Sequence, residues 1–171
     1  MTRPAYTEAL ADSGVLIRLT AFDPHVAGTP PLALDLPDSD IDILCHAPDP
    51  RAFAGAVWAA YRDLPGFAMW QWQGRDRPVV ARFHCSGWLF ELFGQARPVA
   101  EQVGWRHFVL ERRLLALGGE PLRAAVMTRR LAGAKTEPAF AQVLGLAGDP
   151  YAALLMLEGL DDAALCARIG A

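Results

Sequence analysis

Three carboxylates in this chain could form one metal-binding cluster. Asp40 and Asp42 stand two residues apart in the segment Asp40-Ile41-Asp42-Ile43, and Glu91 lies within the apolar run 88–94. Side chains at positions i and i+2 of a strand project from the same face of a sheet, so both aspartates would point to one side. An acid from a later strand would complete a set of oxygen ligands for a hard divalent cation. Without a cation, three such acids would repel one another in an apolar setting, which is costly.

A short turn before the aspartates could bind phosphate. Gly28 has no side chain, so a phosphate can approach its backbone closely, and Thr29 offers both an N–H and a hydroxyl. The alternatives are an ordinary loop at Gly28-Thr29 and a strand edge whose solvent face carries two acids. For Glu91 the alternative is a salt bridge to Arg82, and the two roles are compatible, since Arg82 could also contact substrate phosphates.

A second group of polar residues lies in the C-terminal half, at His107, Lys135 and Glu137. A lone histidine on a helix is more often a hydrogen-bonded packing residue than a functional one. The segment 135–138 is typical of a helix start, with Thr136 as N-cap and Pro138 at the second helical position. The functional alternative is that Lys135 reaches a phosphate or an acceptor and that His107 lies beside the acceptor.

The elements that would position these residues form a strand-rich first part and a helical remainder. Residues 3–20 carry a helical pattern with a break at Gly14, and a helix is expected at 52–64. Strands are predicted at 25–27, 40–46, 67–73, 78–85 and 88–93. Ser86-Gly87 is a two-residue hairpin signal that would place Arg82 opposite Glu91. Four helical segments should follow, at 99–117, 120–132, 137–146 and 150–168.

Length and composition favour one compact α/β (α+β) domain. The 171 residues are 53% hydrophobic, and we expect a single domain with a sheet-containing part at 1–97 and a helical part at 98–171. The net charge of −3 predicts no broad basic surface for extended nucleic-acid binding, and the basic residues do not interleave with the tryptophans. The three cysteines lie in apolar neighbourhoods, which predicts buried, reduced thiols. No signal-type or membrane-spanning segment is apparent, so a soluble, cytoplasmic protein is expected.

The order of these features resembles the nucleotidyltransferase superfamily, whose fold is that of DNA polymerase beta. The resemblance covers residues 13–94: a helix, a short strand, Gly-Thr as a variant of Gly-Ser, Asp-x-Asp on the next strand, and an acid on a later strand. Over nearly the whole chain, the sequence is also similar to an uncharacterised bacterial family, domain of unknown function 4269. The blocks that carry this similarity are 28–32, 39–43, 91–95, 106–107, 135–140 and 148–151.

The superfamily resemblance implies a mixed sheet with flanking helices and a particular set of roles. Asp40 and Asp42 would bind two Mg²⁺ (or Mn²⁺) ions, Glu91 would join them at the catalytic ion, and Gly28 and Thr29 would hold the triphosphate of an NTP. Further candidates for binding the nucleotide are Ser39, Arg82, Lys135 and His107. The implied activity is metal-dependent transfer of a nucleoside monophosphate to a hydroxyl or phosphate acceptor that the sequence does not name. The alternatives are a non-catalytic nucleotide- or metal-binding regulatory module and a metal-dependent phosphohydrolase.

Overall fold

The protein falls into two compact units. The computed structural model describes residues 3–74 and 76–170. The first unit comprises the chain up to Pro31 together with Pro37–Trp105, and it contains the sheet. The second comprises Leu32–Leu36 and the chain from Arg106 onward, and it is mainly helical. No helix within the described ranges combines the length and the apolar character needed to cross a membrane.

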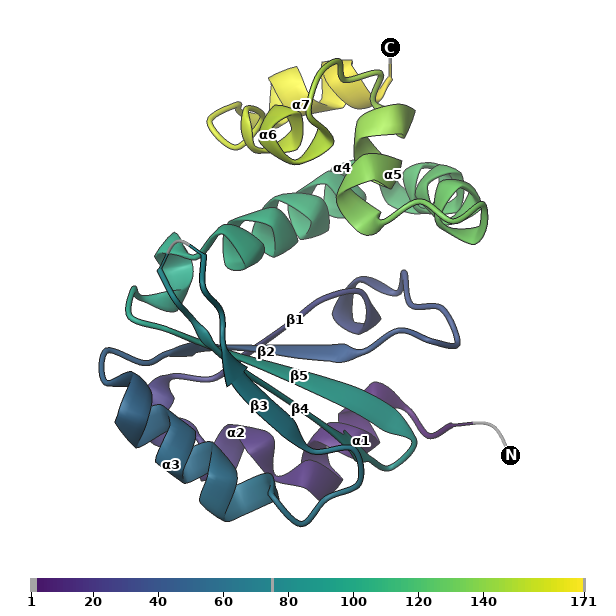
Figure 1. The fold of residues 1–171 in the computed structure, drawn as a ribbon. Coiled ribbons are helices and arrows are strands. Elements are labelled where there is room, and N and C mark those ends of the chain that lie inside the picture. Colours follow the sequence, from purple (N-terminus) through teal and green to yellow (C-terminus); the bar gives the residue numbers. More distant parts are fainter. Residues whose placement is uncertain (1–2, 75, 171) are drawn as a thin grey trace. The chain divides into compact units, whose positions relative to one another are not determined.

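The first unit is built on a mixed five-stranded sheet, as predicted. Its spatial order is β1-β2-β5-β4-β3 (Figure 1). The strands are β1 (His25–Ala27), β2 (Ile41–His46), β3 (Ala68–Gln71), β4 (Val79–Cys85) and β5 (Trp88–Gln95). Strands β2 and β5 are parallel, and every other neighbouring pair is antiparallel.

The hairpin between β4 and β5 confirms the turn at Ser86-Gly87. Both turn residues have positive φ, 48° and 77°, as a type I′ turn requires. The register that follows pairs Cys85 with Trp88 and Arg82 with Glu91, again as predicted. This turn therefore fixes which face of β5 carries Glu91.

Three helices cover one face of the sheet: α1 (Tyr6–Ser13), α2 (Val15–Arg18) and α3 (Pro50–Tyr61) (Figure 1). Ile41 and Ile43 of β2 point into the core on this side and are fully buried. Gly14 ends α1 in a left-handed conformation, which confirms the expected break. Helix α3 begins earlier than predicted because the Asp49 carboxylate accepts bonds from the first backbone N–H groups and Pro50 suits the first helical position.

Helix α3 approaches β5 very closely at Gly94. A Cβ atom added at Gly94 would lie 2.4 Å from Cδ1 of Phe53, a fully buried ring on α3. The absence of a side chain therefore lets α3 pack directly against the sheet. Gly55, on the same helix, has open space around the position that a Cβ would take.

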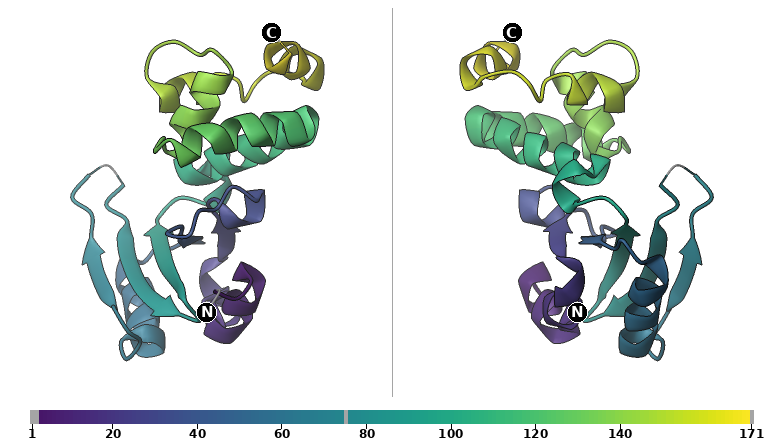
Figure 2. Two further views of the ribbon diagram at one scale, coloured as in Figure 1. Left: turned by 90° about the vertical axis from the view of Figure 1, so that its right-hand side faces the viewer. Right: turned by 90° about the vertical axis from the view of Figure 1, so that its left-hand side faces the viewer.

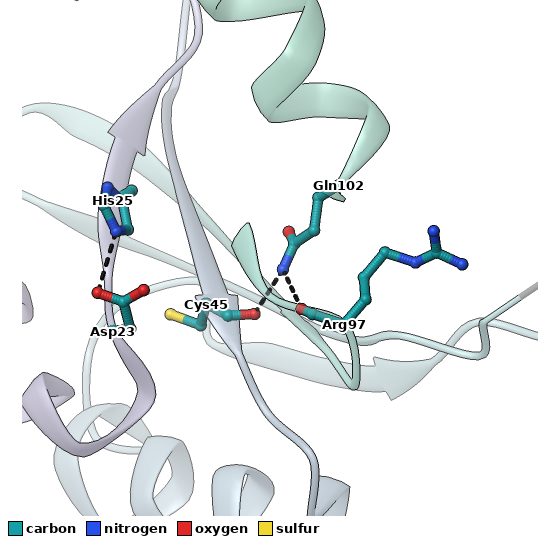
Figure 3. Close-up of polar contacts among 5 residues, drawn as sticks. All are labelled: Asp23, His25, Cys45, Arg97 and Gln102. Carbon is teal, nitrogen blue, oxygen red and sulfur yellow. Dashed lines mark hydrogen bonds and ion pairs between the residues drawn. The ribbon is translucent and has the colours of Figure 1, made fainter. Parts of the chain in front are cut away.

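A buried glutamine ties the end of β2 to the segment that follows β5 (Figure 3). The Gln102 side-chain amide donates to the carbonyl oxygens of Cys45 at 3.0 Å and Arg97 at 3.1 Å. At the start of the neighbouring strand β1, His25 contacts the Asp23 carboxylate at 3.0 Å (Figure 3).

The second unit contains most of α4 (Val103–Leu131) together with α5 (Thr136–Val143), α6 (Pro150–Leu155) and α7 (Asp162–Ile169). Helices α5, α6 and α7 gather on one side of α4 (Figure 2). Gly119, with φ 58° and ψ −153°, interrupts α4 at the expected break. The single helix expected at 150–168 is wrong: α6 and α7 are separate, and the Asp161 side chain caps the start of α7.

The structure corrects two further expectations. Thr136 is not the N-cap of α5: Lys135 holds that position, and the Thr136 hydroxyl instead accepts a hydrogen bond from the Arg130 guanidinium. The cysteines are not all buried. Cys45 is buried, and burial raises the pKa of its thiol to about 12, but Cys85 is half-buried and Cys166 on α7 is exposed.

The close approach at Gly94 gives a stability prediction. We expect Gly94→Ala to lower the free energy of unfolding by about 1–3 kcal/mol, because the added methyl overpacks the core against Phe53. Gly55→Ala is the control and should raise it by roughly 0.5–1 kcal/mol, since the site is open and helical. Urea denaturation of both variants provides the measurement. Equal stability of Gly94→Ala and the parent protein would contradict the close packing.

Candidate functional site

The structure brings the three acids together on the sheet face opposite the helices. Parallel pairing of β2 and β5 places Asp42 directly beside Glu91, and Asp40 immediately precedes β2. One carboxylate oxygen from each residue lies within 4.8 Å of the others, and all three side chains are half-buried. An all-oxygen donor set of this size fits a hard divalent cation such as Mg²⁺ or Mn²⁺.

The surroundings of Glu91 disfavour the charged form of its carboxyl group. Burial raises the pKa of the Glu91 carboxyl, repulsion by Asp40 raises it further, and Arg82 partly offsets both by lowering it. An acid whose charged form is disfavoured by burial and by a like charge gains most from a bound cation. The local electrostatics therefore agree with the chemistry of the donor set.

Gly28 packs directly against the acid cluster. Residue Ala27 of β1 pairs with Asp42 of β2, so the chain enters Gly28 beside that carboxylate. Gly28 has φ 78°, and a Cβ added there would lie only 2.5 Å from Oδ2 of Asp42. From the sequence we expect Gly28→Val to leave the metal ligands in place; this expectation is wrong, because any side chain at position 28 would displace Asp42.

The loop beyond Gly28 is held by side-chain contacts. The Thr29 hydroxyl donates to Oγ of Ser39 at 3.2 Å, which joins the two ends of the connection between β1 and β2. The Arg3 guanidinium donates to the carbonyl oxygens of Ser39 at 2.9 Å and Pro37 at 3.0 Å, and it lies 3.2 Å from the centre of the Trp88 ring. No sequence motif marks Arg3, because its partners lie more than thirty residues away.

Arg82 lies opposite Glu91, but the salt bridge considered as the alternative role of Glu91 does not form. No salt bridge joins the two among the side chains that the structure describes. Arg82 is exposed, and its guanidinium is 5.9 Å from the centre of the Trp70 ring. A direct salt bridge is therefore not what stabilises Glu91, and the guanidinium is available to solvent at the rim of the acid face.

His107 and Lys135 belong to the second unit. His107 lies on α4 and is buried, whereas Lys135 is exposed at the start of α5. His107 groups with Glu111 and Glu137 in a second set of polar side chains. Sequence analysis missed Glu111, although its spacing of four residues from His107 is the spacing that places two side chains on one helix face.

The fold is of the nucleotidyltransferase type, as the solved structures that it matches show. The structure of Cid1, which has RNA terminal uridylyl transferase activity, matches with a TM-score of 0.56 and 14% identity. The match covers 89% of this chain and 48% of the Cid1 chain. Cid1 poly(U) polymerase bound to MgGTP matches with a TM-score of 0.54 and 14% identity over 90% of this chain and 49% of its own. The GLD-2/RNP-8 complex matches with a TM-score of 0.54 and 10% identity over 90% of this chain and 57% of its own. The chain thus spans about half the length of these structures.

The chain belongs to the family called domain of unknown function 4269, whose model matches residues 8–157. This confirms the resemblance found in the sequence. Comparison with curated proteins gives no match.

The repulsion within the acid cluster gives a second stability prediction. In metal-free protein at neutral pH, Glu91→Gln should be more stable than the parent by on the order of 0.2–1 kcal/mol, the size of a cross-strand charge interaction. The Glu91 pKa is raised in the folded state, so its ionisation disfavours folding above that raised pKa. The difference should shrink as the pH falls through the folded-state pKa and disappear below the ordinary value of 4.5.

Chemical denaturation in the presence of a chelator, at several pH values, measures this difference. The matched control is Glu101→Gln, an exposed acid in the same unit. A Glu91→Gln protein that is less stable than the parent at neutral pH would mean that Glu91 has a stabilising partner.

Proposed function

We propose that the protein is a metal-dependent nucleotidyltransferase that moves a nucleoside monophosphate from an NTP to a hydroxyl or phosphate acceptor. The observation that carries the proposal is the convergence of Asp40, Asp42 and Glu91, with one oxygen of each within 4.8 Å of the others. Similarity of the fold to Cid1 poly(U) polymerase, a structure of which holds MgGTP, supports the choice of substrate class.

Each acid has a distinct place in this proposal. Asp40 and Asp42 hold two divalent cations, and Glu91 joins them from the neighbouring strand. Bound cations of this kind lower the pKa of an attacking hydroxyl and neutralise charge on the leaving pyrophosphate. The rigid sheet keeps the acids in fixed positions, so little reorganisation is needed when the substrate binds.

The turn at Gly28-Thr29 holds the triphosphate. Gly28 exposes its backbone beside Asp42, so that phosphate oxygens can approach a backbone N–H and a carboxylate-bound cation together. In the free protein the half-buried Thr29 hydroxyl donates its proton to Ser39, and on binding it would exchange this bond for one to a phosphate oxygen. Arg82 is exposed and lies opposite Glu91 in the pairing of β4 with β5. Its guanidinium supplies a positive charge for the phosphates.

Lys135 and His107 both belong to the second unit and differ in exposure. Lys135 is exposed, and its ammonium has the charge that suits a phosphate or an acceptor group. His107 is buried, and burial lowers the pKa of its imidazole, so we assign it no role in the transfer itself.

The first test is turnover with each NTP labelled at the α-phosphate, in the presence of Mg²⁺ and a panel of RNA ends, small-molecule hydroxyls and proteins. We expect pyrophosphate release together with transfer of the label to one acceptor class. Asp42→Asn should lower the rate about 100-fold or more, because cations contribute several kcal/mol to such transfers. Asp38→Asn, an exposed acid just before the cluster, is the control and should retain the parent rate.

Other results of this experiment would favour one of the alternative functions or contradict the proposal. Magnesium-dependent NTP binding without pyrophosphate release would favour the non-catalytic regulatory module. Label that appears only in free nucleotide would favour a phosphohydrolase with water as acceptor. Absence of any NTP binding in the presence of Mg²⁺ would contradict both the transferase and the nucleotide-binding module.

The second test concerns the phosphate-binding turn. We expect Thr29→Val to weaken NTP binding roughly 10- to 100-fold, the effect of losing a hydrogen bond to a charged group of about 1.5–3 kcal/mol. Valine matches threonine in shape, so Asp42 should not be displaced. Thr128→Val is the control, because that exposed hydroxyl bonds to the backbone of its own helix. Calorimetric titration with Mg²⁺-NTP gives the affinities, and an unchanged affinity for Thr29→Val would remove the residue from the site.

A further inference from the structure

The second unit contains a cluster of metal-ligand type that the proposed transferase chemistry does not use. His107 and Glu111 lie one turn apart on α4, and Glu137 lies in the first turn of α5. One ligand atom of each residue lies within 4.8 Å of the others. The cluster is complete within the second unit, and all three members come from that unit.

Two of the three side chains in this cluster are buried, and the third is half-buried. His107 is 4% exposed and Glu111 is 5% exposed, and the Glu137 side chain is half-buried. Among the described residues, neither ring nitrogen of His107 has a hydrogen-bond partner, and neither does the buried Oε1 of Glu111. A buried polar atom without a partner costs about 1–3 kcal/mol. Three such atoms in one place therefore indicate that a further group completes the site.

The two helices hold the side chains in fixed positions. Residues at i and i+4 project from the same face of a helix, so α4 alone sets the separation of His107 and Glu111. The start of α5 is held to α4 by the hydrogen bond from the Arg130 guanidinium to the Thr136 hydroxyl, next to Glu137. The His107 ring packs edge-on against Tyr151 of α6, with ring centres 6.2 Å apart.

We propose that His107, Glu111 and Glu137 bind a first-row divalent transition-metal ion of the Zn²⁺ type. Two oxygen donors and one imidazole suit such an ion, whereas Mg²⁺ and Ca²⁺ prefer oxygen donors alone. With metal–ligand distances of roughly 2.0–2.2 Å, two ligands of a tetrahedral ion lie about 3.3–3.6 Å apart. The three ligand atoms lie within 4.8 Å of one another, so a modest movement of the side chains brings them onto one ion. Three protein ligands leave one position of a tetrahedral ion for water.

The electrostatics of the cluster agree with a bound cation. Burial lowers the pKa of His107, which keeps the imidazole neutral and able to ligate. Burial raises the pKa of Glu111 well above its ordinary range; Glu137 adds to this effect and Arg130 opposes it. A divalent ion would offset the cost of ionising Glu111 beside Glu137.

A metal at this position would act as a clamp between helices. It would join α4, which supplies two ligands, to α5, which supplies the third. Such a site stabilises the folded state by its binding free energy. The inference concerns the helical unit alone and does not depend on the transferase proposal.

The test uses the full chain with the first site disabled. In the Asp40→Asn/Asp42→Asn protein, we expect calorimetry to show one Zn²⁺ bound per chain and thermal denaturation to show a higher melting temperature with Zn²⁺ than with chelator. Adding Glu111→Gln or His107→Gln should each reduce Zn²⁺ affinity by more than the roughly 10- to 100-fold that loss of an outer-shell partner causes. Glu120→Gln, an acid of α4 whose side chain is 82% exposed, is the matched control and should change nothing.

Cobalt substitution gives an independent measurement. Co²⁺ added to the same protein should produce visible absorption bands, and these should change when His107 is replaced, since imidazole is one of the ligands. Zn²⁺ affinity that neither Glu111→Gln nor His107→Gln alters would overturn the proposal, as would the absence of Zn²⁺ binding. Circular dichroism of the metal-free variants shows whether each has folded, and either variant alone suffices for the comparison.

Discussion

The parallel pairing of β2 with β5 is the constraint on which the acid cluster depends. Parallel neighbours cannot be joined by a tight turn, so the chain passes through α3, β3 and β4 before it returns as β5. The last step of that path is the Ser86-Gly87 hairpin, which sets the register of β5. A slip of one residue would turn Glu91 into the core and bring Phe90 or Leu92 beside Asp42. The chemistry on one side of the sheet thus rests on a two-residue turn at its end.

The two faces of the sheet have opposite energetic roles. The face toward α1, α2 and α3 is apolar and tightly packed, to the extent that Gly94 has no room for a methyl group beside Phe53. The other face holds three carboxylates, and the charged form of one of them, Glu91, is disfavoured by burial and by Asp40. Burial on the first face offsets the cost of the charge repulsion at Glu91 on the second. Gly28 extends the close packing to the acid face, where a Cβ atom at this position would collide with Asp42.

The features that sequence could predict are those set by local periodicity and turn chemistry. The alternation of Asp40, Ile41 and Asp42 indicated the face of the acids, and Ser86-Gly87 indicated the pairing of Arg82 with Glu91. The features it could not predict depend on partners distant in the chain. Thr136 has the residue type of an N-cap, yet its hydroxyl is engaged by Arg130, and the contact of Gly28 with Asp42 arises only when β1 and β2 pair. Glu111 went unnoticed because its significance depends on Glu137, which arrives from another helix.

The uneven exposure of the three cysteines has a practical consequence. Cys45 is buried and its thiol pKa is about 12, so it is almost wholly protonated and unreactive at neutral pH, and Cys85 is half-buried. Cys166 is the exposed one of the three, on α7 of the second unit. A thiol-reactive fluorophore will therefore attach preferentially to α7 in the natural sequence, without any engineered cysteine. Such a label provides an optical reporter of events in the helical unit while the acid face of the sheet stays chemically untouched.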